Sequence, residues 1–385
     1  MPEAPTHRSA RSRSAILRAA TDLCAELGYG SVTIEAIAAK AKVGKPTVYR
    51  WWPSKHAVLL DAMLEIGAEF SITASPTGDV VADLRAWLHN CADTLNDPTL
   101  RPLITGVLGA AQTDPADFRS RIWRRDSVPA PKPDPKQLRL VSWNIERGRR
   151  LQAVSAALAR EAPDILLLQE VDLNARRSGA VDIPDELARQ LGMSYAFAAE
   201  FQELGQGTSG SPAYHGQAVL ASSTIRSASI IRFTDQSDFW RPRWYLPNWA
   251  VFQRRIGGRL ALAAEIEAGR QNLVVYSVHL ESRGPEALRL RQMQQVLAHA
   301  GKYPGAAPIV IAGDLNVEGA SSPVIQAVLQ AGFVTALGGE VTTARGAPLD
   351  WIFVRGGLRF AEGSVRRETR ASDHYPLTVR LAVGQ

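Results

Sequence analysis

Ile309-Val-Ile-Ala-Gly-Asp314-Leu-Asn316 is the stretch around which the second half of this chain is organised. Its uncharged, largely β-branched residues predict a buried strand that stops at a glycine. A carboxylate and an amide, Asp314 and Asn316, follow at the end of that strand. Because residues two apart on a strand point to the same side, the two side chains can address one small target together. A Gly-Asp turn after a strand is common by itself, so a catalytic role depends on what else the chain carries.

The composition favours a two-domain protein. The chain has 385 residues, of which 45% are hydrophobic, enough for two buried cores. Its two cysteines exclude a disulfide framework and a cysteine-based zinc site. No signal-peptide core and no uncharged apolar run of membrane-spanning length is present, which predicts a cytoplasmic protein without a membrane span.

Positive charge is concentrated at the N-terminal end. The whole chain has a net charge of +6, and residues 1–60 hold nine basic and four acidic side chains, a net charge of +5. Such a bias favours a polyanionic partner for this end of the molecule.

The same end has the pattern of a helix-turn-helix. An amphipathic stripe over residues 16–27 precedes a short helix that Thr33 can cap. The turn Ala41-Lys-Val-Gly44 then leads into a second short helix, Lys45-Pro46-Thr47-Val48-Tyr49, and Pro46 suits its first turn. A short helix of basic, hydroxyl and aromatic residues is typical of one that enters the major groove of DNA. The structural alternative is a helical hairpin whose charges face solvent.

Residues 11–66 resemble the DNA-binding domain of the TetR family of repressors. The shared pattern is Thr33-Ile34, Ile37-Ala38, Ala41, Val43, Thr47-Val48-Tyr49, Trp52, Ser54-Lys55 and Leu59. The resemblance implies that DNA is the partner, that Lys45, Pro46, Thr47 and Tyr49 approach bases or sugar edges, and that Thr33 and Lys55 hold phosphates.

The resemblance to a repressor ends early. Helical stripes continue to residue 124, as a truncated effector region, and prolines at every second position from Pro129 to Pro135 then predict an extended linker. We therefore expect a DNA-binding domain at 11–124 and a linker at 125–137. The truncation leaves effector sensing and dimerisation open.

From residue 138 strands alternate with helices, which predicts one α/β domain over residues 138–385. Polar side chains stand at the ends of its predicted strands. They are Asn144 and Glu146, Glu170, His279, Asp314 and Asn316, Asp350, and the pair Asp373 and His374. Carboxylate and amide oxygens suit a hard divalent cation such as Mg²⁺ or Mn²⁺, and two histidines remain for proton transfer.

This domain resembles the endonuclease/exonuclease/phosphatase superfamily. The motifs are Trp-Asn144-Ile, Leu-Gln-Glu170-Val, His279-Leu, Gly-Asp314-Leu-Asn316, Asp350 and Ser-Asp373-His374. The resemblance implies the four-layer α/β sandwich of deoxyribonuclease I, with two mixed sheets face to face and helices outside, and a metal-dependent phosphoric ester hydrolase.

The resemblance also assigns roles to single residues. Glu170 matches the principal metal ligand, with Asn144, Glu146 and Asp373 close to the metal. Asp314 matches the residue that orients or deprotonates the attacking water, and Asn316 would hold a phosphate oxygen. His374 matches a transition-state-stabilising histidine that Asp350 steadies, and His279 is the candidate general acid.

One position departs from the family pattern. The usual Gly-Asn-Ala reads Gly216-Gln217-Ala218 here, and the extra methylene is expected to displace the amide by roughly an ångström, which can cost much of the rate.

Three hypotheses for the whole chain therefore stay open. It is a Mg²⁺-dependent nuclease or phosphodiesterase that carries a DNA-binding module, or a TetR-family regulator whose hydrolase-like domain is a sensor or inactive. The third hypothesis is an accidental fusion of two reading frames.

Overall fold

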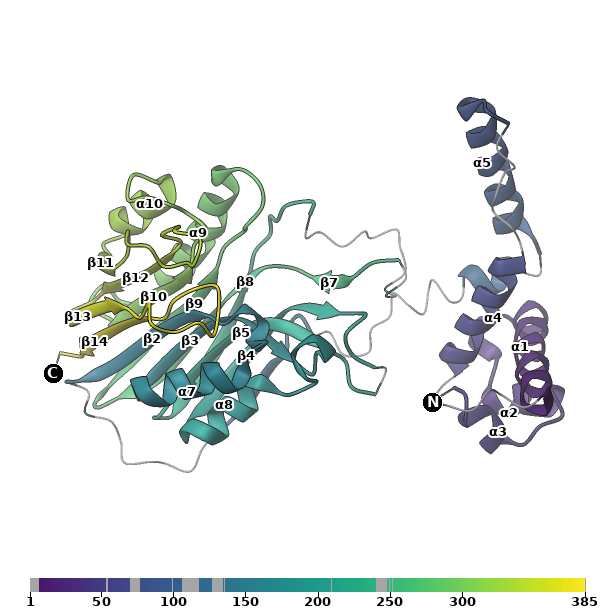
Figure 1. Ribbon diagram of the computed structural model, residues 1–385, viewed down its shortest axis with the longest axis horizontal. Coiled ribbons are helices and arrows are strands. Elements are labelled where there is room, and N and C mark those ends of the chain that lie inside the picture. The colour runs from purple at the N-terminus through teal and green to yellow at the C-terminus, as the bar shows by residue number, and fades with distance from the viewer. Residues whose placement is uncertain are drawn as a thin grey trace. The chain divides into compact units, whose positions relative to one another are not determined.

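The computed structural model of the chain consists of two units, Met1–Pro115 and Ala116–Gln385, each of which is described by itself. The structure describes residues 7–52, 55–69, 77–98, 100–105, 118–126, 134, 136–208, 210–239, 248, 250 and 252–384. Figure 1 labels most of the helices and strands of both units. Among the described residues, no helix combines the length and the apolar character that crossing a membrane requires.

The first unit is helical in its described part. Its elements are α1 (His7–Leu27), the 3₁₀ turn η1 (Tyr29–Ser31), α2 (Ile34–Lys40), α3 (Lys45–Tyr49), α4 (Lys55–Glu69) and α5 (Val80–Asn96). The hydroxyl of Thr33 accepts a hydrogen bond from the Ala36 amide at 3.1 Å, so Thr33 caps α2 as predicted. Pro46 lies in the first turn of α3, also as predicted.

A small apolar core holds these helices together. Ile16 of α1, Ile37 of α2, Val48 of α3 and Leu59 of α4 are each fully buried. Because Val48 is the buried residue of α3, that helix is fixed by one face and presents the other.

The second unit contains two mixed sheets. The first has the order β1-β4-β5-β3-β2-β14-β13, with β7 paired to β4, and the second has the order β11-β12-β10-β9-β8-β6. The bounds in the first sheet are β1 (Ile122–Arg125), β2 (Leu138–Asn144), β3 (Ile165–Leu173), β4 (Ser194–Glu203), β5 (Tyr214–Ala221), β7 (Arg255–Gly257), β13 (Arg359–Val365) and β14 (Leu377–Ala382). Those in the second are β6 (Ile225–Arg232), β8 (Leu260–Ala268), β9 (Gln271–His279), β10 (Ile309–Asp314), β11 (Val334–Leu337) and β12 (Asp350–Arg355).

Three apolar layers separate the sheets and helices. Leu140 and Leu167 of the first sheet pack against Val275 and Val310 of the second in the central layer. Helices α7 (Leu151–Glu161) and α8 (Ile183–Leu191) cover the outer face of the first sheet, and α9 (Glu286–Ala300) and α10 (Pro323–Gln330) cover that of the second. Figure 1 shows the two helix pairs on opposite sides of the sheets. The predicted four-layer sandwich is confirmed.

Strand β1 extends the second unit beyond its predicted start. The prediction placed residues 118–124 with the N-terminal helices, but Ile122–Arg125 pairs antiparallel with β4 at the edge of the first sheet. Phe118 is buried in the outer core of that sheet, and the ring of Trp123 lies 5.5 Å from that of Phe197. The residues that follow β1, 127–133 and 135 of the predicted linker, lie outside the described part of the chain.

An edge strand exposes unpaired backbone groups, and β1 covers those of β4. Trp123 holds β1 in place, since it also contacts Tyr214 at 4.9 Å between ring centroids. The residues before the proline-rich stretch therefore belong to the core of the second unit.

We predict that Trp123→Ala destabilises the second unit by roughly 2–4 kcal/mol, because it removes an aromatic side chain from a packed layer. Amide hydrogen exchange at Ala196 and Ala198 of β4 should accelerate in the variant. Phe360→Ala, which removes a 40% exposed ring from the edge strand β13, is the matched control. Unchanged unfolding and exchange in Trp123→Ala would show that β1 contributes nothing.

Candidate active site

The second sheet brings three of the predicted residues into one row. β10 pairs with β9 and β12 in a register that sets Asp314 opposite both His279 and Asp350. Gly313 makes this close pairing possible, because it has φ 146° and a Cβ atom there would lie 1.9 Å from the carbonyl oxygen of Val278. The glycine of the Gly-Asp motif is thus a requirement of the strand pairing.

Asp314 is the residue on which the site converges. The residue is 2% exposed, and its Oδ2 accepts a hydrogen bond from Asn144 Nδ2 at 3.1 Å. The same oxygen lies 3.5 Å from His279 Nε2 and 3.7 Å from His374 Nε2. Burial, aided by Asp350, raises the pKa of Asp314 to about 7, against the opposing effects of His374 and Asn144. Since Asn144 ends β2, the site lies where the two sheets end together.

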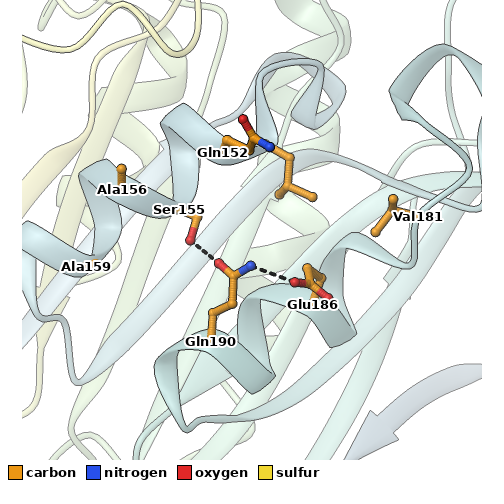
Figure 2. A pocket seen from close by; sticks show the side chains of 8 residues that line it. Gln152, Ser155, Ala156, Ala159, Val181, Glu186 and Gln190 are labelled. Atoms are coloured by element: carbon orange, nitrogen blue, oxygen red, sulfur yellow. Dashed lines mark hydrogen bonds between the residues drawn. The ribbon is translucent and has the colours of Figure 1, made fainter.

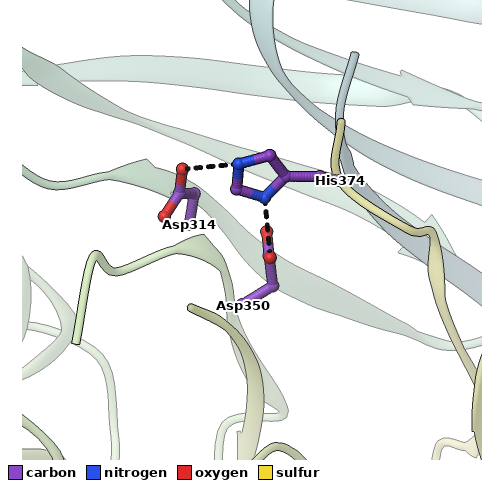
Figure 3. A group of neighbouring side chains, drawn as sticks. All are labelled: Asp314, Asp350 and His374. Atoms are coloured by element: carbon purple, nitrogen blue, oxygen red, sulfur yellow. Dashed lines mark hydrogen bonds and ion pairs between the residues drawn. The ribbon is translucent and has the colours of Figure 1, made fainter. Parts of the chain in front are cut away.

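His374 bridges two carboxylates. Its Nδ1 lies 2.8 Å from Asp350 Oδ2, while Nε2 faces Asp314, as Figure 3 shows. Burial alone would lower the pKa of His374, but the carboxylates of Asp350 and Asp314 outweigh it and raise the pKa to about 10. The imidazole is therefore a cation at neutral pH, in agreement with a predicted role beside developing negative charge.

His279 has the opposite surroundings. It is 1% exposed, and Arg259 Nη1 donates a hydrogen bond to its Nδ1 at 2.8 Å. Burial and the Arg259 guanidinium hold the pKa of His279 well below its usual value. A neutral imidazole is a poor source of protons, so these contacts do not favour the general-acid role that the sequence suggested.

The predicted metal ligands line the neighbouring strand ends of the first sheet. Glu170 sits at an irregularity in β3, has φ 51°, and its Oε2 lies 3.8 Å from Arg147 Nε. Burial would raise the pKa of Glu170, but nearby basic side chains, His215 and Arg147 foremost, lower it. Glu170 is therefore an ionised, partly exposed carboxylate, which a hard cation can reach.

The other three predicted ligands differ in how well they are placed. Asn144 Oδ1 accepts a hydrogen bond from the backbone N–H of Glu146 at 3.1 Å, which orients both residues. The Glu146 carboxylate lies 3.6 Å from the Arg149 guanidinium. Asp373 is exposed beside His374. This set offers only oxygen atoms, so its chemistry fits Mg²⁺ or Mn²⁺.

Among the described residues, the one group of three acidic or histidine side chains compact enough for a metal is Asp314, Asp350 and His374. We do not assign a metal to it, because both nitrogens of His374 face carboxylates and a protonated imidazole has no lone pair to offer.

Backbone strain marks the same region. Glu146, Glu170 and Asn316 have φ of 48°, 51° and 52°, the left-handed region that non-glycine residues rarely adopt. Such strain persists where the surrounding structure enforces it, and it gathers at functional sites. Asn316 also donates its backbone N–H to Asp314 Oδ1 and its side chain to the Leu280 carbonyl, each at 3.1 Å.

Gln217 does not point at the reacting centre. Its Nε2 donates to Glu200 Oε1 at 3.1 Å and to the Leu260 carbonyl at 2.5 Å, and all of its side chain is buried. The extra methylene therefore connects the amide to Glu200, which in turn pairs with Arg259 at 2.9 Å.

Sequence reasoning missed several buried charges around the site. Arg259 and Glu200 have no local motif, and their partners are far away along the chain. A second group lies two residues beyond Glu170, where Asp172 binds Arg177 through both oxygens at 2.7 Å and His215 at 2.8 Å. His215 stands directly before Gly216-Gln217, and that adjacency was the only available signal.

A hollow on the outer helix layer is unrelated to these residues. It has a volume of about 590 Å³ and lies between α7 and α8 (Figure 2). Ser155 of α7 donates a hydrogen bond to Gln190 of α8, and Gln190 donates one to Glu186 of the same helix. No histidine lines this hollow, so we place the candidate active site at Asp314.

The first unit presents most of its predicted DNA-contacting residues. Lys45, Pro46 and Tyr49 of α3 are exposed, and Thr47 is half-buried. Lys55 differs, because its ammonium donates to the carbonyls of Tyr29, Gly30 and Val32 at 3.4, 3.0 and 2.9 Å. Its three donors hold the turn before α2 together, which does not favour the predicted phosphate contact.

Comparison with known proteins identifies both parts. Residues 141–374 match the model of the endonuclease/exonuclease/phosphatase family, and the chain belongs to that family of hydrolases. Residues 16–62 match the bacterial regulatory proteins of the tetR family. The chain therefore joins a TetR-type DNA-binding module to a hydrolase-family domain, as the sequence predicted.

Individual relatives resemble one part each. An uncharacterized HTH-type transcriptional regulator of Bacillus subtilis, YdeS, is 34% identical over 120 residues, which are 30% of this chain and 60% of that protein. Another, Rv1556 of Mycobacterium tuberculosis, is 40% identical over 62 residues, 16% of this chain and 30% of that protein. The match thus spans less than two thirds of either regulator.

Solved structures resemble the other part. An endonuclease/exonuclease/phosphatase from Beutenbergia cavernae is 18% identical, with a TM-score of 0.49, over 65% of this chain and 72% of that one. The human Nocturnin catalytic domain is 19% identical, with a TM-score of 0.48, over 69% and 97%.

We predict that Asp350→Asn lowers the pKa of His374 from about 10, because it removes the carboxylate 2.8 Å from Nδ1. An NMR titration of the metal-free protein measures this directly. The folded pKa lies above the unfolded value of about 6.5, so the stability that the charged pair contributes is complete below that pH and is lost as the pH rises toward 10. The variant should flatten this dependence. A His374 that still titrates near 10 in Asp350→Asn would contradict the assignment.

Proposed function

We propose that the second unit hydrolyses phosphate esters with Mg²⁺ or Mn²⁺, and that the first unit binds DNA. The observation that carries the first part is the convergence of Asn144, His279 and His374 on the buried Asp314 carboxylate. Attack of water on a phosphoryl group needs a base, charge stabilisation and exclusion of bulk water, and these residues supply all three.

The residues divide this work as follows. Asp314 orients the water and takes up its proton, because its Oδ2 is the point that the other polar groups face. His374 offers Nε2–H and a positive charge to the phosphoryl oxygens, while Asp350 fixes its ring. Asn316 has a second amide hydrogen, beyond the one bonded to Leu280, for a phosphate oxygen.

Glu170 and Asn144, with Glu146 and Asp373 nearby, would hold the cation. A bound Mg²⁺ or Mn²⁺ supplies further neutralisation of negative charge on the phosphoryl oxygens. Assay of DNA, phosphotyrosyl-DNA, a phospholipid and an inositol phosphate distinguishes nuclease from phosphatase activity.

We expect phosphate-ester hydrolysis to need added Mg²⁺ or Mn²⁺ and to stop on chelation. Glu170→Gln keeps the shape of the side chain and removes its charge, so it should lower turnover and shift half-maximal activation to higher metal concentration. The control is Glu186→Gln, which removes a carboxylate of α8 at the outer hollow and should behave as wild type. Full activity of Glu170→Gln at low metal concentration would refute the ligand assignment.

The DNA-binding part rests on the exposed face of α3. Base contacts give sequence preference, so Tyr49→Ala should reduce discrimination between a selected site and random DNA by roughly 1–3 kcal/mol. Val81→Ala, an exposed residue of α5, should leave it unchanged. Binding curves at two salt concentrations separate this loss from a general loss of charge contacts. Equal discrimination by Tyr49→Ala and wild type would exclude α3 as the reading helix.

A further inference from the structure

A chain of four buried polar side chains leads from the first sheet to the active site. Gln217 of β5 donates to Glu200 of β4, Glu200 pairs with Arg259, and Arg259 donates to His279 at the end of β9. The four side chains are between 0% and 3% exposed. Burying four polar side chains is costly unless they hydrogen bond to one another, so this row of side chains is expected to have a role.

Arg259 decides where His279 carries its proton. One nitrogen, Nη1, lies 2.9 Å from Glu200 Oε2 and 2.8 Å from His279 Nδ1, so its two hydrogens serve both partners. A guanidinium donates and never accepts. His279 Nδ1 must therefore accept, and the ring hydrogen lies on Nε2, the nitrogen 3.5 Å from Asp314 Oδ2.

The two histidines of the site thus differ in protonation state because their hydrogen-bond partners differ in charge. Asp350 accepts from Nδ1 of His374 and favours an imidazolium, whereas Arg259 donates to Nδ1 of His279 and favours a neutral ring. The surroundings of His279 reinforce this. Burial, followed by the nearby basic side chains of Arg259, His215, His374 and Arg147, lowers the pKa of His279, although the Asp314 carboxylate faces its Nε2.

We propose that Arg259 is a positioning residue that locks His279 as its neutral Nε2–H tautomer, so that His279 donates a hydrogen bond to a phosphoryl oxygen instead of a proton to the leaving group. The role toward substrate rests on the proposed hydrolysis, but the tautomer does not. Glu200 holds the guanidinium, because a buried arginine without a counterion is strongly unfavourable. Gln217, through its longer side chain, holds Glu200 and spans to the Leu260 carbonyl.

The tautomer is tested on the full chain without metal. The protein has seven histidines, so ¹⁵N-histidine spectra are tractable, and His279→Gln assigns the resonance of interest. We expect His279 Nε2 to be protonated, Nδ1 to be unprotonated, and neither to titrate between pH 5.5 and 8. A His279 that titrates near pH 6.5, or that carries its proton on Nδ1, would overturn the inference whatever the activity.

Substitutions of Arg259 provide a second test of the tautomer of His279. Arg259→Met removes the donor, so His279 should exchange between tautomers and lose its resistance to protonation. Arg259→Lys keeps a donor and should restore the Nε2–H state. Arg355→Met is the matched control, because Arg355 donates to the Ala300 and Ala331 carbonyls away from His279. If Arg259→Met fails to fold, the Lys variant and the wild-type spectrum still decide the matter.

Rates of hydrolysis distinguish a hydrogen-bond-donor role of His279 from a role as general acid. His279→Ala should slow hydrolysis of an activated nitrophenyl ester and of an ester with a poor leaving group by the same factor. Arg259→Met should lower turnover about 10- to 100-fold, by analogy with residues that orient metal-ligating histidines, and Arg259→Lys should recover most of it. A loss confined to the poor leaving group would show that His279 is an acid and contradict the proposal. Absence of all hydrolysis with the expected spectra would refute the proposed function and leave the tautomer standing.

Discussion

The site depends on one constraint, the burial of the Asp314 carboxylate where the two sheets end. A buried carboxylate is costly unless polar groups surround it, and here an amide, a backbone N–H and two imidazoles do so. Each of these groups comes from a different strand end or loop. Gly313 lets β10 approach β9 closely enough to align Asp314 with His279. Packing between the two sheets holds their ends together.

The charge of each histidine in the site depends on the side chain that is hydrogen bonded to it. Two histidines face the same oxygen, and one is made cationic by a carboxylate while the other is kept neutral by a guanidinium. This arrangement gives the site one fixed positive charge and one neutral donor. A proton delivered to the leaving group must then come from elsewhere, and a water molecule is the simplest source.

The sequence predicted the fold well because its signals were local. Strand ends in an α/β domain meet at one edge, so ordered motifs such as Gly-Asp314-Leu-Asn316 and Ser-Asp373-His374 indicated both the fold and the residues near the centre. The four residues of β1 had no such signal, since Ile-Trp-Arg-Arg lacks an apolar stripe and forms a strand only by pairing with β4. The roles of Lys55 and His279 depended on partners that lie 20 to 26 residues away, beyond any motif.

The position of β1 also bears on how the two parts of the chain are joined. Because residues before the proline-rich stretch are packed into the hydrolase-family unit, that stretch connects two strands of one sheet and does not join the two units. Whether the second unit is an active enzyme is the central question. Turnover of the substrate panel by Asp314→Asn, with Asp235→Asn at the exposed Arg291 pair as control, tests it most directly. The account predicts metal-dependent hydrolysis by wild type and control, and a loss of roughly 10²–10⁴-fold in Asp314→Asn. Equal turnover by all three proteins, or none by wild type on any ester, would contradict it.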